Sequence, residues 1–135
     1  MCGEIDEQVL VGQELLDRAR FLTRKMDLPA PGAGEGEAPT GLAEAEGRAA
    51  YMERIFRSGL ARALDDIARA EDDEAVDALA AQAIALARLA GFLAGQLPPE
   101  ADLFRAVIEA AAAGSAETRE MAAAERHSHD HHHHH

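Results

Sequence analysis

The residues best suited to chemistry gather at the C-terminus. All seven histidines of the chain lie in its last nine residues, HSHDHHHHH. Neutral imidazole is a ligand for Ni(II), Zn(II), Co(II) and Cu(II), and the aspartate adds a carboxylate. The run predicts a site with many alternative ligand sets and no fixed geometry, which takes Ni(II) or Zn(II). The predicted ligands are His127, His129, Asp130, His131, His132, His133, His134 and His135.

A purification tag would show the same chemistry. Tags usually carry one unbroken histidine run after a short linker, whereas here five histidines follow HSHD and no linker precedes them. This pattern favours an encoded tail, and the tag remains the alternative. The chain resembles nickel-handling accessory proteins in this tail alone. For either origin, metal affinity should fall as the imidazoles become protonated below about pH 6.5.

No other group of residues has the pattern of a catalytic site. The chain before the tail lacks histidine, so the glutamates and Glu-x-x-His elements of a helical di-iron centre cannot be built. The glycines of residues 32–36 lack the lysine of a phosphate loop, and the acidic residues 71–74 lack EF-hand spacing. Cys2 resembles the N-terminal nucleophile of glutamine amidotransferases, but no strand pattern supports their β-sandwich. We predict that the protein is not an enzyme.

Charge and composition narrow the partners and the compartment. The formal net charge is −12, from 25 acidic and 13 basic residues, which repels the phosphate backbone and argues against a nucleic-acid partner. A single cysteine excludes an intrachain disulfide, as expected in the cytoplasm. No secretory signal pattern precedes the first apolar residues. The most apolar window, residues 78–95, contains Gln82 and Arg88, which favours a core helix over a membrane span.

Apolar residues recur at intervals of three and four along most of the chain and predict an all-α fold. Four main helices are expected, over about 5–26, 42–70, 74–96 and 100–114, followed by a short helix that Ser115 caps. The expected organisation is an amphipathic N-terminal helix in residues 1–28, a flexible Pro/Gly linker in 29–41, a helical bundle in 42–126 and a disordered His-rich tail in 127–135.

Two helices carry faces that predict self-association. The stripe of the second helix approaches a heptad repeat, which favours a partner helix. The third helix is apolar nearly all round, so it should be the most buried, and its small residues recur every four positions and permit close helix packing. We predict a homodimer through one of these faces. The predicted interface residues are Met52, Phe56, Gly59 and Ala63 on the second helix, and Ala87, Gly91 and Gly95 on the third.

Polar residues at and inside the third helix have structural interpretations. Asp72 or Asp73 is expected to cap its first turn. Gln82 and Arg88 predict either an interhelical hydrogen bond or an exposed strip. A bend at Gly59 is expected in the second helix.

Two functional hypotheses follow. The first is a cytoplasmic helical protein that binds, stores or senses a divalent transition metal through its tail. The alternative is a non-catalytic interaction or regulatory adaptor, a homodimeric bundle whose histidine run is a tag and whose first or second helix binds a protein partner. A third hypothesis, an effector-binding domain, requires a cavity lined by Met52, Phe56, Phe92 and Phe104.

Overall fold

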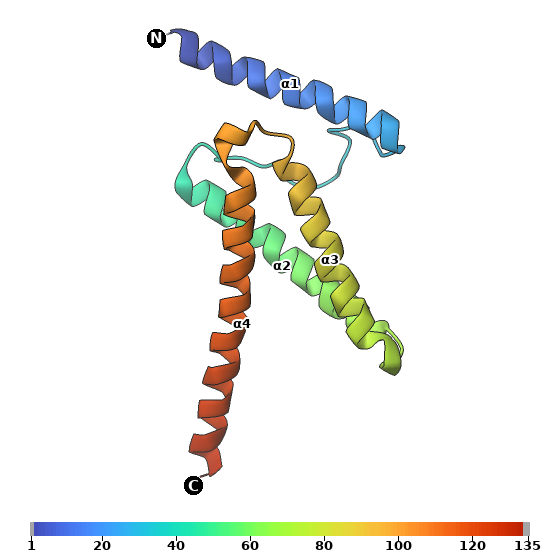
Figure 1. The fold of residues 1–135 in the computed structure, drawn as a ribbon, viewed down its shortest axis with the longest axis vertical. Helices are drawn as coiled ribbons and strands as arrows, with labels where there is room; N and C mark the ends of the chain where they lie inside the picture. The colour runs from blue at the N-terminus through green and yellow to red at the C-terminus, as the bar shows by residue number, and fades with distance from the viewer. Residues whose placement is uncertain (1, 134–135) are drawn as a thin grey trace. The chain divides into compact units, whose positions relative to one another are not determined.

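The computed structural model describes the backbone of residues 2–133 and the side chains of residues 12–128. Within this range the chain forms four α-helices and two short 3-10 helices and no strand, so the predicted all-α class is confirmed (Figure 1). The helices are α1 (Cys2–Met26), α2 (Ala45–Arg69), η1 (Asp72–Glu74), α3 (Ala75–Ala94), η2 (Pro99–Ala101) and α4 (Leu103–His133).

The chain divides into two compact units, Met1–Ala61 and Arg62–His135. The division falls inside α2. The first unit therefore holds α1, the linker and the first part of α2, and the second holds the end of α2 with η1, α3, η2 and α4.

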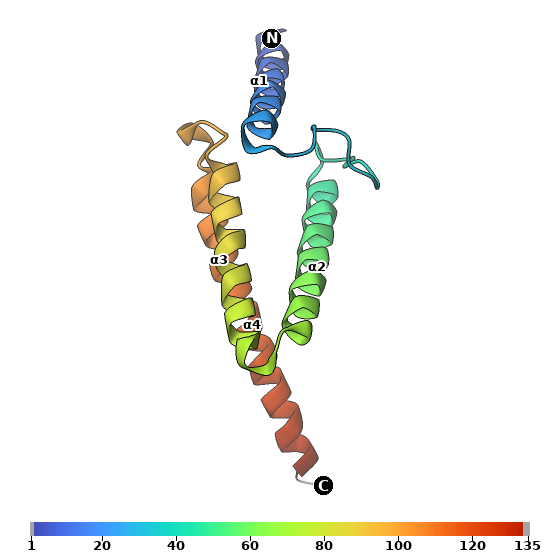
Figure 2. The same cartoon turned by 90° about the vertical axis from the view of Figure 1, so that its right-hand side faces the viewer.

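Helix α1 ends at a left-handed residue. Asp27 has a φ of 56°, and the backbone N–H of Leu28 donates to the carbonyl of Thr23 at 2.8 Å. This is the hydrogen-bond pattern of a helix C-terminus that usually ends in glycine. The basic residues Arg24 and Lys25 lie in the last turn, where their charge favours the helix dipole. Beyond it the chain runs without a helix as far as Ala45 (Figure 2).

The start of α2 depends on close backbone contacts. The Arg48 guanidinium donates to the carbonyls of Leu42 and Ala43, both at 3.0 Å. Gly41 has a φ of 69°, and a Cβ added at Gly47 would collide with the Gly41 carbonyl. Only glycine fits both positions, because one needs the left-handed conformation and the other has no room for a side chain.

Arg54 ties the linker to α2. Its Nη1 lies 3.4 Å from Oε2 of Glu37, and its guanidinium carbon lies 5.6 Å from the centroid of the Tyr51 ring. Both the arginine and the glutamate are exposed, so the ion pair contributes at most about 1 kcal/mol.

In the second unit, α3 and α4 form a hairpin through η2. Pro99 lies in the first turn of η2, where its fixed φ suits a helix start, and Asp102 then turns the chain with a φ of 54°. The two helices contact each other beside this turn and diverge away from it (Figure 1). Ala94 packs here at 7% exposure and is the one buried residue among those whose side chains are described.

The prediction that the third helix is a buried core helix was wrong, although α3 does hold Ala94, the one buried residue among the described side chains. Within α3 the large apolar side chains remain exposed, because α4 approaches only the C-terminal end of this helix. They are Val76, Leu79, Ile84, Leu86, Leu89, Phe92 and Leu93.

The predicted cap of the third helix was also wrong. Residues Asp72–Glu74 form a 3-10 turn, in which the N–H of Glu74 donates to the carbonyl of Glu71 at 2.8 Å. Glu74 occupies the cap position of α3 without a side-chain hydrogen bond. The acidic residues still face the positive end of α3, which the helix dipole favours.

The predicted helix end at Gly114 was wrong, since α4 continues from Leu103 to His133 as one helix. Alanines on both sides of Gly114 are strong helix formers that offset the cost of one glycine. The hydroxyl of Thr118 donates to the Gly114 carbonyl at 3.3 Å, one turn further on. Likewise, α2 passes through Gly59 as one helix.

Candidate functional site

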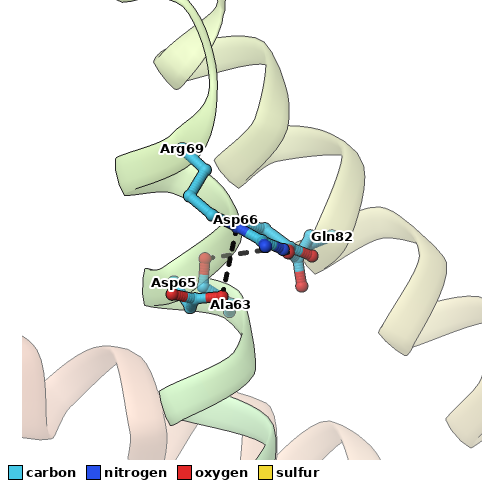
Figure 3. A network of polar contacts seen from close by, with 5 residues as sticks. All are labelled: Ala63, Asp65, Asp66, Arg69 and Gln82. Atoms are coloured by element: carbon cyan, nitrogen blue, oxygen red, sulfur yellow. Dashed lines mark hydrogen bonds and ion pairs between the residues drawn. The ribbon is translucent and has the colours of Figure 1, made fainter.

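A small polar network joins the end of α2 to α3. The Gln82 amide donates to the carbonyl of Ala63 at 3.5 Å and to Oδ2 of Asp66 at 3.3 Å (Figure 3). Both bonds are partly buried. The interhelical hydrogen bond predicted for Gln82 is therefore confirmed, and it sets the register between the two helices.

Ion pairs along α2 hold the acceptor in place. Nη2 of Arg69 lies 3.1 Å from Oδ1 of Asp66, and Nε of Arg69 lies 3.3 Å from Oδ2 of Asp65 (Figure 3). Arg69 and Asp65 are largely exposed and Asp66 is half-buried, so the pairs contribute only a few tenths of a kcal/mol each. This network holds two helices in a fixed orientation. Its side chains do not include a nucleophile paired with a base, so its role is structural.

Replacing Gln82 with alanine should lower the free energy of unfolding by about 1 kcal/mol, because two partly buried hydrogen bonds are lost. Urea unfolding followed by circular dichroism measures this change. Gln13→Ala is the matched control, since Gln13 is exposed on α1 and its replacement should change stability by less than about 0.5 kcal/mol. Equal stability of the wild type and the Gln82 variant would contradict the role of the network.

The main surface feature of the second unit is apolar. Val76 is 79% exposed and Ile84 is 71% exposed, although each would gain roughly 1.5–3 kcal/mol on full burial. Large apolar side chains left exposed in such number are typical of an interaction site in a folded protein. The exposed large apolar residues of this unit are Leu64, Val76, Leu79, Ile84, Leu86, Leu89, Phe92, Leu93, Phe104, Ile108 and Met121.

The first unit is also open to solvent. No residue between positions 12 and 61 is buried. A shallow hollow on α1 is lined by Gln13, Leu16, Asp17 and Arg20. It lies on one helix and is open to solvent, so it is not a cavity that could surround a ligand. Its exposed large apolar residues are Leu16, Phe21, Met26, Leu28, Leu42, Met52, Ile55, Phe56 and Leu60.

The predicted interface residues fall in both units. On α2, Met52, Phe56 and Gly59 are exposed in the first unit, while Ala63 is half-buried in the second, where its carbonyl accepts from Gln82. The homodimer itself stays a prediction. The four residues proposed to line an effector cavity, Met52, Phe56, Phe92 and Phe104, are all exposed.

The predicted residues of α3 form an accessible line near the end of that helix. Ala87 and Gly95 are exposed, Gly91 is half-buried, and a Cβ added at Gly91 would meet no atom within 4 Å. Val76 and Ile84 were missed as interface candidates. The sequence pattern that could have identified them is the apolar character of α3 on all sides. We interpreted this pattern as burial within the chain.

The predicted metal ligands lie almost entirely outside the described side chains. Of the set, His127 alone is described, and it is exposed. His129, Asp130, His131, His132, His133, His134 and His135 lie beyond that range. Between positions 12 and 128, no group of three or more histidine, cysteine or acidic side chains is placed to hold a metal ion.

One segment, Asp72–Ala94, is long and apolar enough to cross a membrane by these two criteria alone. A core helix of a water-soluble protein meets the same criteria, but such a helix is mostly buried and this one is exposed. The expectation that the protein has no membrane partner therefore stays a prediction, as does its cytoplasmic location.

The fold and the surface together define the class: an all-α chain that presents unpaired apolar helix faces. Comparisons with protein-family models, characterised proteins and solved structures find no match to this chain.

Proposed function

We propose that this chain is a non-catalytic helical interaction protein, whose apolar helix faces are covered by helices of another chain. The observation that carries the proposal is the contrast between helix length and burial. Helices α2, α3 and α4 span 25, 20 and 31 residues, yet Ala94 alone is buried among residues 12–128.

Energetics explain why such helices need a partner. Ordering the backbone costs about 1–2 kcal/mol per residue, and most helical stability in proteins comes from packing of an apolar helix face. Burial of apolar side chains is the main term that offsets this cost. Contacts inside each unit supply little burial, so association with other helices is the available source of stability.

Metal binding through the tail is a second proposal. It is supported by the helical backbone of α4, which extends to His133. Positions 127 and 131 are four residues apart and share one helix face, and positions 129 and 133 share a second face, nearly opposite the first. Pairs of histidines at this spacing ligate zinc in helical metalloenzyme motifs. We propose Ni(II) or Zn(II) as the metal and the cytoplasm as the location.

Mass in solution tests both proposals. Light scattering after size exclusion would be applied to the full chain and to a chain that ends at Arg126, each with and without sub-stoichiometric Ni(II) or Zn(II). We expect both chains to have more than the mass of one copy, and metal to change the assembly or melting of the full chain only.

Three outcomes would contradict these proposals. A monomeric mass for both chains, with no added partner and stable helices, would argue against assembly as the source of stability. Equal nickel affinity of the two chains would remove the tail as the metal site. An effect of metal that a chelator does not reverse would indicate aggregation in place of coordination.

A further inference from the structure

Helix α3 carries two charged residues, Asp77 and Arg88, along a segment that is otherwise apolar but for Gln82. They lie eleven residues apart. At about 100° per residue this is three full rotations around the helix axis plus roughly 20°, so both residues lie along one edge of the helix. Within the described part of the chain neither side chain has a hydrogen-bond or ion-pair partner.

An exposed apolar face adjoins this edge. Val76, Ala80, Ile84 and Ala87 recur at intervals of four and three residues and so share one side of α3. Val76 and Ile84 are the large side chains of this face, at 79% and 71% exposure. The alanines between them allow another helix to come close.

We propose that this face packs against the same face of a second copy of the chain, with the two α3 helices antiparallel. The inference rests on the proposed function and names its partner. The midpoint between Asp77 and Arg88 falls between Gln82 and Ala83. A two-fold axis at this midpoint places Asp77 of each copy opposite the partner's Arg88, so two ion pairs form along the same edge.

The charge arrangement selects a second copy in this orientation. A two-fold interface requires a surface that complements itself, and one acid and one base placed symmetrically about the axis meet this condition. A parallel arrangement would bring like charges to the same level along the helix axis. Like charges across an interface oppose association, whereas the antiparallel arrangement neutralises all four groups.

A lipid bilayer fits the same helix less well. Arg88 lies inside the apolar segment Asp72–Ala94, five residues past its middle at Ala83. An arginine costs about 2.5–3.5 kcal/mol at the centre of a span and less toward its ends, so the bilayer would carry part of this cost. Asp77 adds a second charge. A bilayer supplies no counter-charge for either group, whereas the second copy supplies both.

Charge reversal tests the proposal on the full chain. In Asp77→Arg, the arginines at positions 77 and 88 of the two copies face each other across the interface. In Arg88→Asp, two aspartates face each other at the same places. Each single variant should therefore raise the dissociation constant of the homodimer roughly tenfold. The double variant Asp77→Arg/Arg88→Asp restores opposite charges and should return the constant to within about twofold of the wild type. A mixture of the two single variants should form heterodimers with near wild-type affinity. Sedimentation equilibrium measures the dissociation constant of the wild type, the two single variants, the double variant and the mixture. Circular dichroism checks that helix content is unchanged.

Each alternative gives a different pattern. A wild-type chain that sediments as a monomer would overturn the second copy as partner, while leaving open a partner of different sequence under the proposed function. A wild-type dimer that both single reversals leave unchanged would overturn this face, and assembly would stand. Single reversals that weaken the dimer without rescue by the double variant would overturn the antiparallel pairing. Co-flotation of the wild type with phosphatidylcholine vesicles in place of dimer formation would assign α3 to a bilayer.

Discussion

On dilution, the melting temperature of the wild-type chain should fall steeply. If helices of another copy supply most of the burial, folding and association are one equilibrium, and each tenfold dilution removes about 1.4 kcal/mol of stability. Thermal melts followed by circular dichroism from about 100 μM to 0.1 μM would then lose about 4 kcal/mol. For a chain of this size that corresponds to a fall on the order of 10 °C or more.

The dilution series has a direct control. Ile84→Glu introduces a charge into the exposed apolar face of α3 and removes little contact inside the chain, since Ile84 is 71% exposed. The variant should melt at a lower temperature and depend on concentration less. A wild-type melting temperature that stays constant across the dilution series would show that the chain buries its apolar faces without a second copy, and would contradict the self-association proposal.

Ala116→Pro should unfold the distal part of α4. Residue 116 lies in the interior of a helix that spans Leu103–His133. Proline there removes the hydrogen bond to the carbonyl of Ala112 and clashes with that carbonyl, at a cost of about 3 kcal/mol or more. Circular dichroism should show the loss of several turns of helix beyond this point. The same substitution would be favourable if Ser115 capped a separate helix, because proline suits a first helical position.

Ala116→Gly is the matched control for the proline variant. It changes the same position but keeps the backbone N–H, so it should cost only about 1 kcal/mol and preserve the helix. Similar helix loss in both variants would indicate that the end of α4 is marginal whatever the substitution. Unchanged helix content in the proline variant would show that a new helix begins near Ser115.

The sequence was sufficient to predict helices from local periodicity. The start of α3 and the end of α1 agree with the predicted bounds to within a few residues, because Asp72–Glu74 and the Pro/Gly linker interrupt the helical pattern clearly. The contact of Gln82 was also predictable, since an amide in an apolar helix needs partners. The helix bounds depend only on residues close together in the sequence, and the Gln82 contact depends only on the polarity of one side chain.

Burial was not predictable in the same way. An apolar helix is expected inside a core, and periodicity does not say whether that core belongs to one chain or to several. Helix α3 was placed inside the chain for this reason, yet Val76 and Ile84 are exposed. The continuity of α4 was missed because Gly114 and Ser115 match a helix end locally, while the four alanines of residues 110–113 and the strong helix formers that follow Ser115 favour continuation.

The length of α4 affects how many copies of the chain could be joined through their tails. At about 1.5 Å per residue, its 31 residues extend roughly 46 Å from the hairpin turn, whereas the 20 residues of α3 extend about 30 Å. The end of α4 therefore projects past the start of α3 (Figure 2). In an antiparallel dimer the two projecting ends point in opposite directions, so a metal ion shared by two tails cannot close within one dimer. If the tails bind nickel as proposed, a shared ion would link successive dimers end to end and would turn a closed pair into a linear polymer.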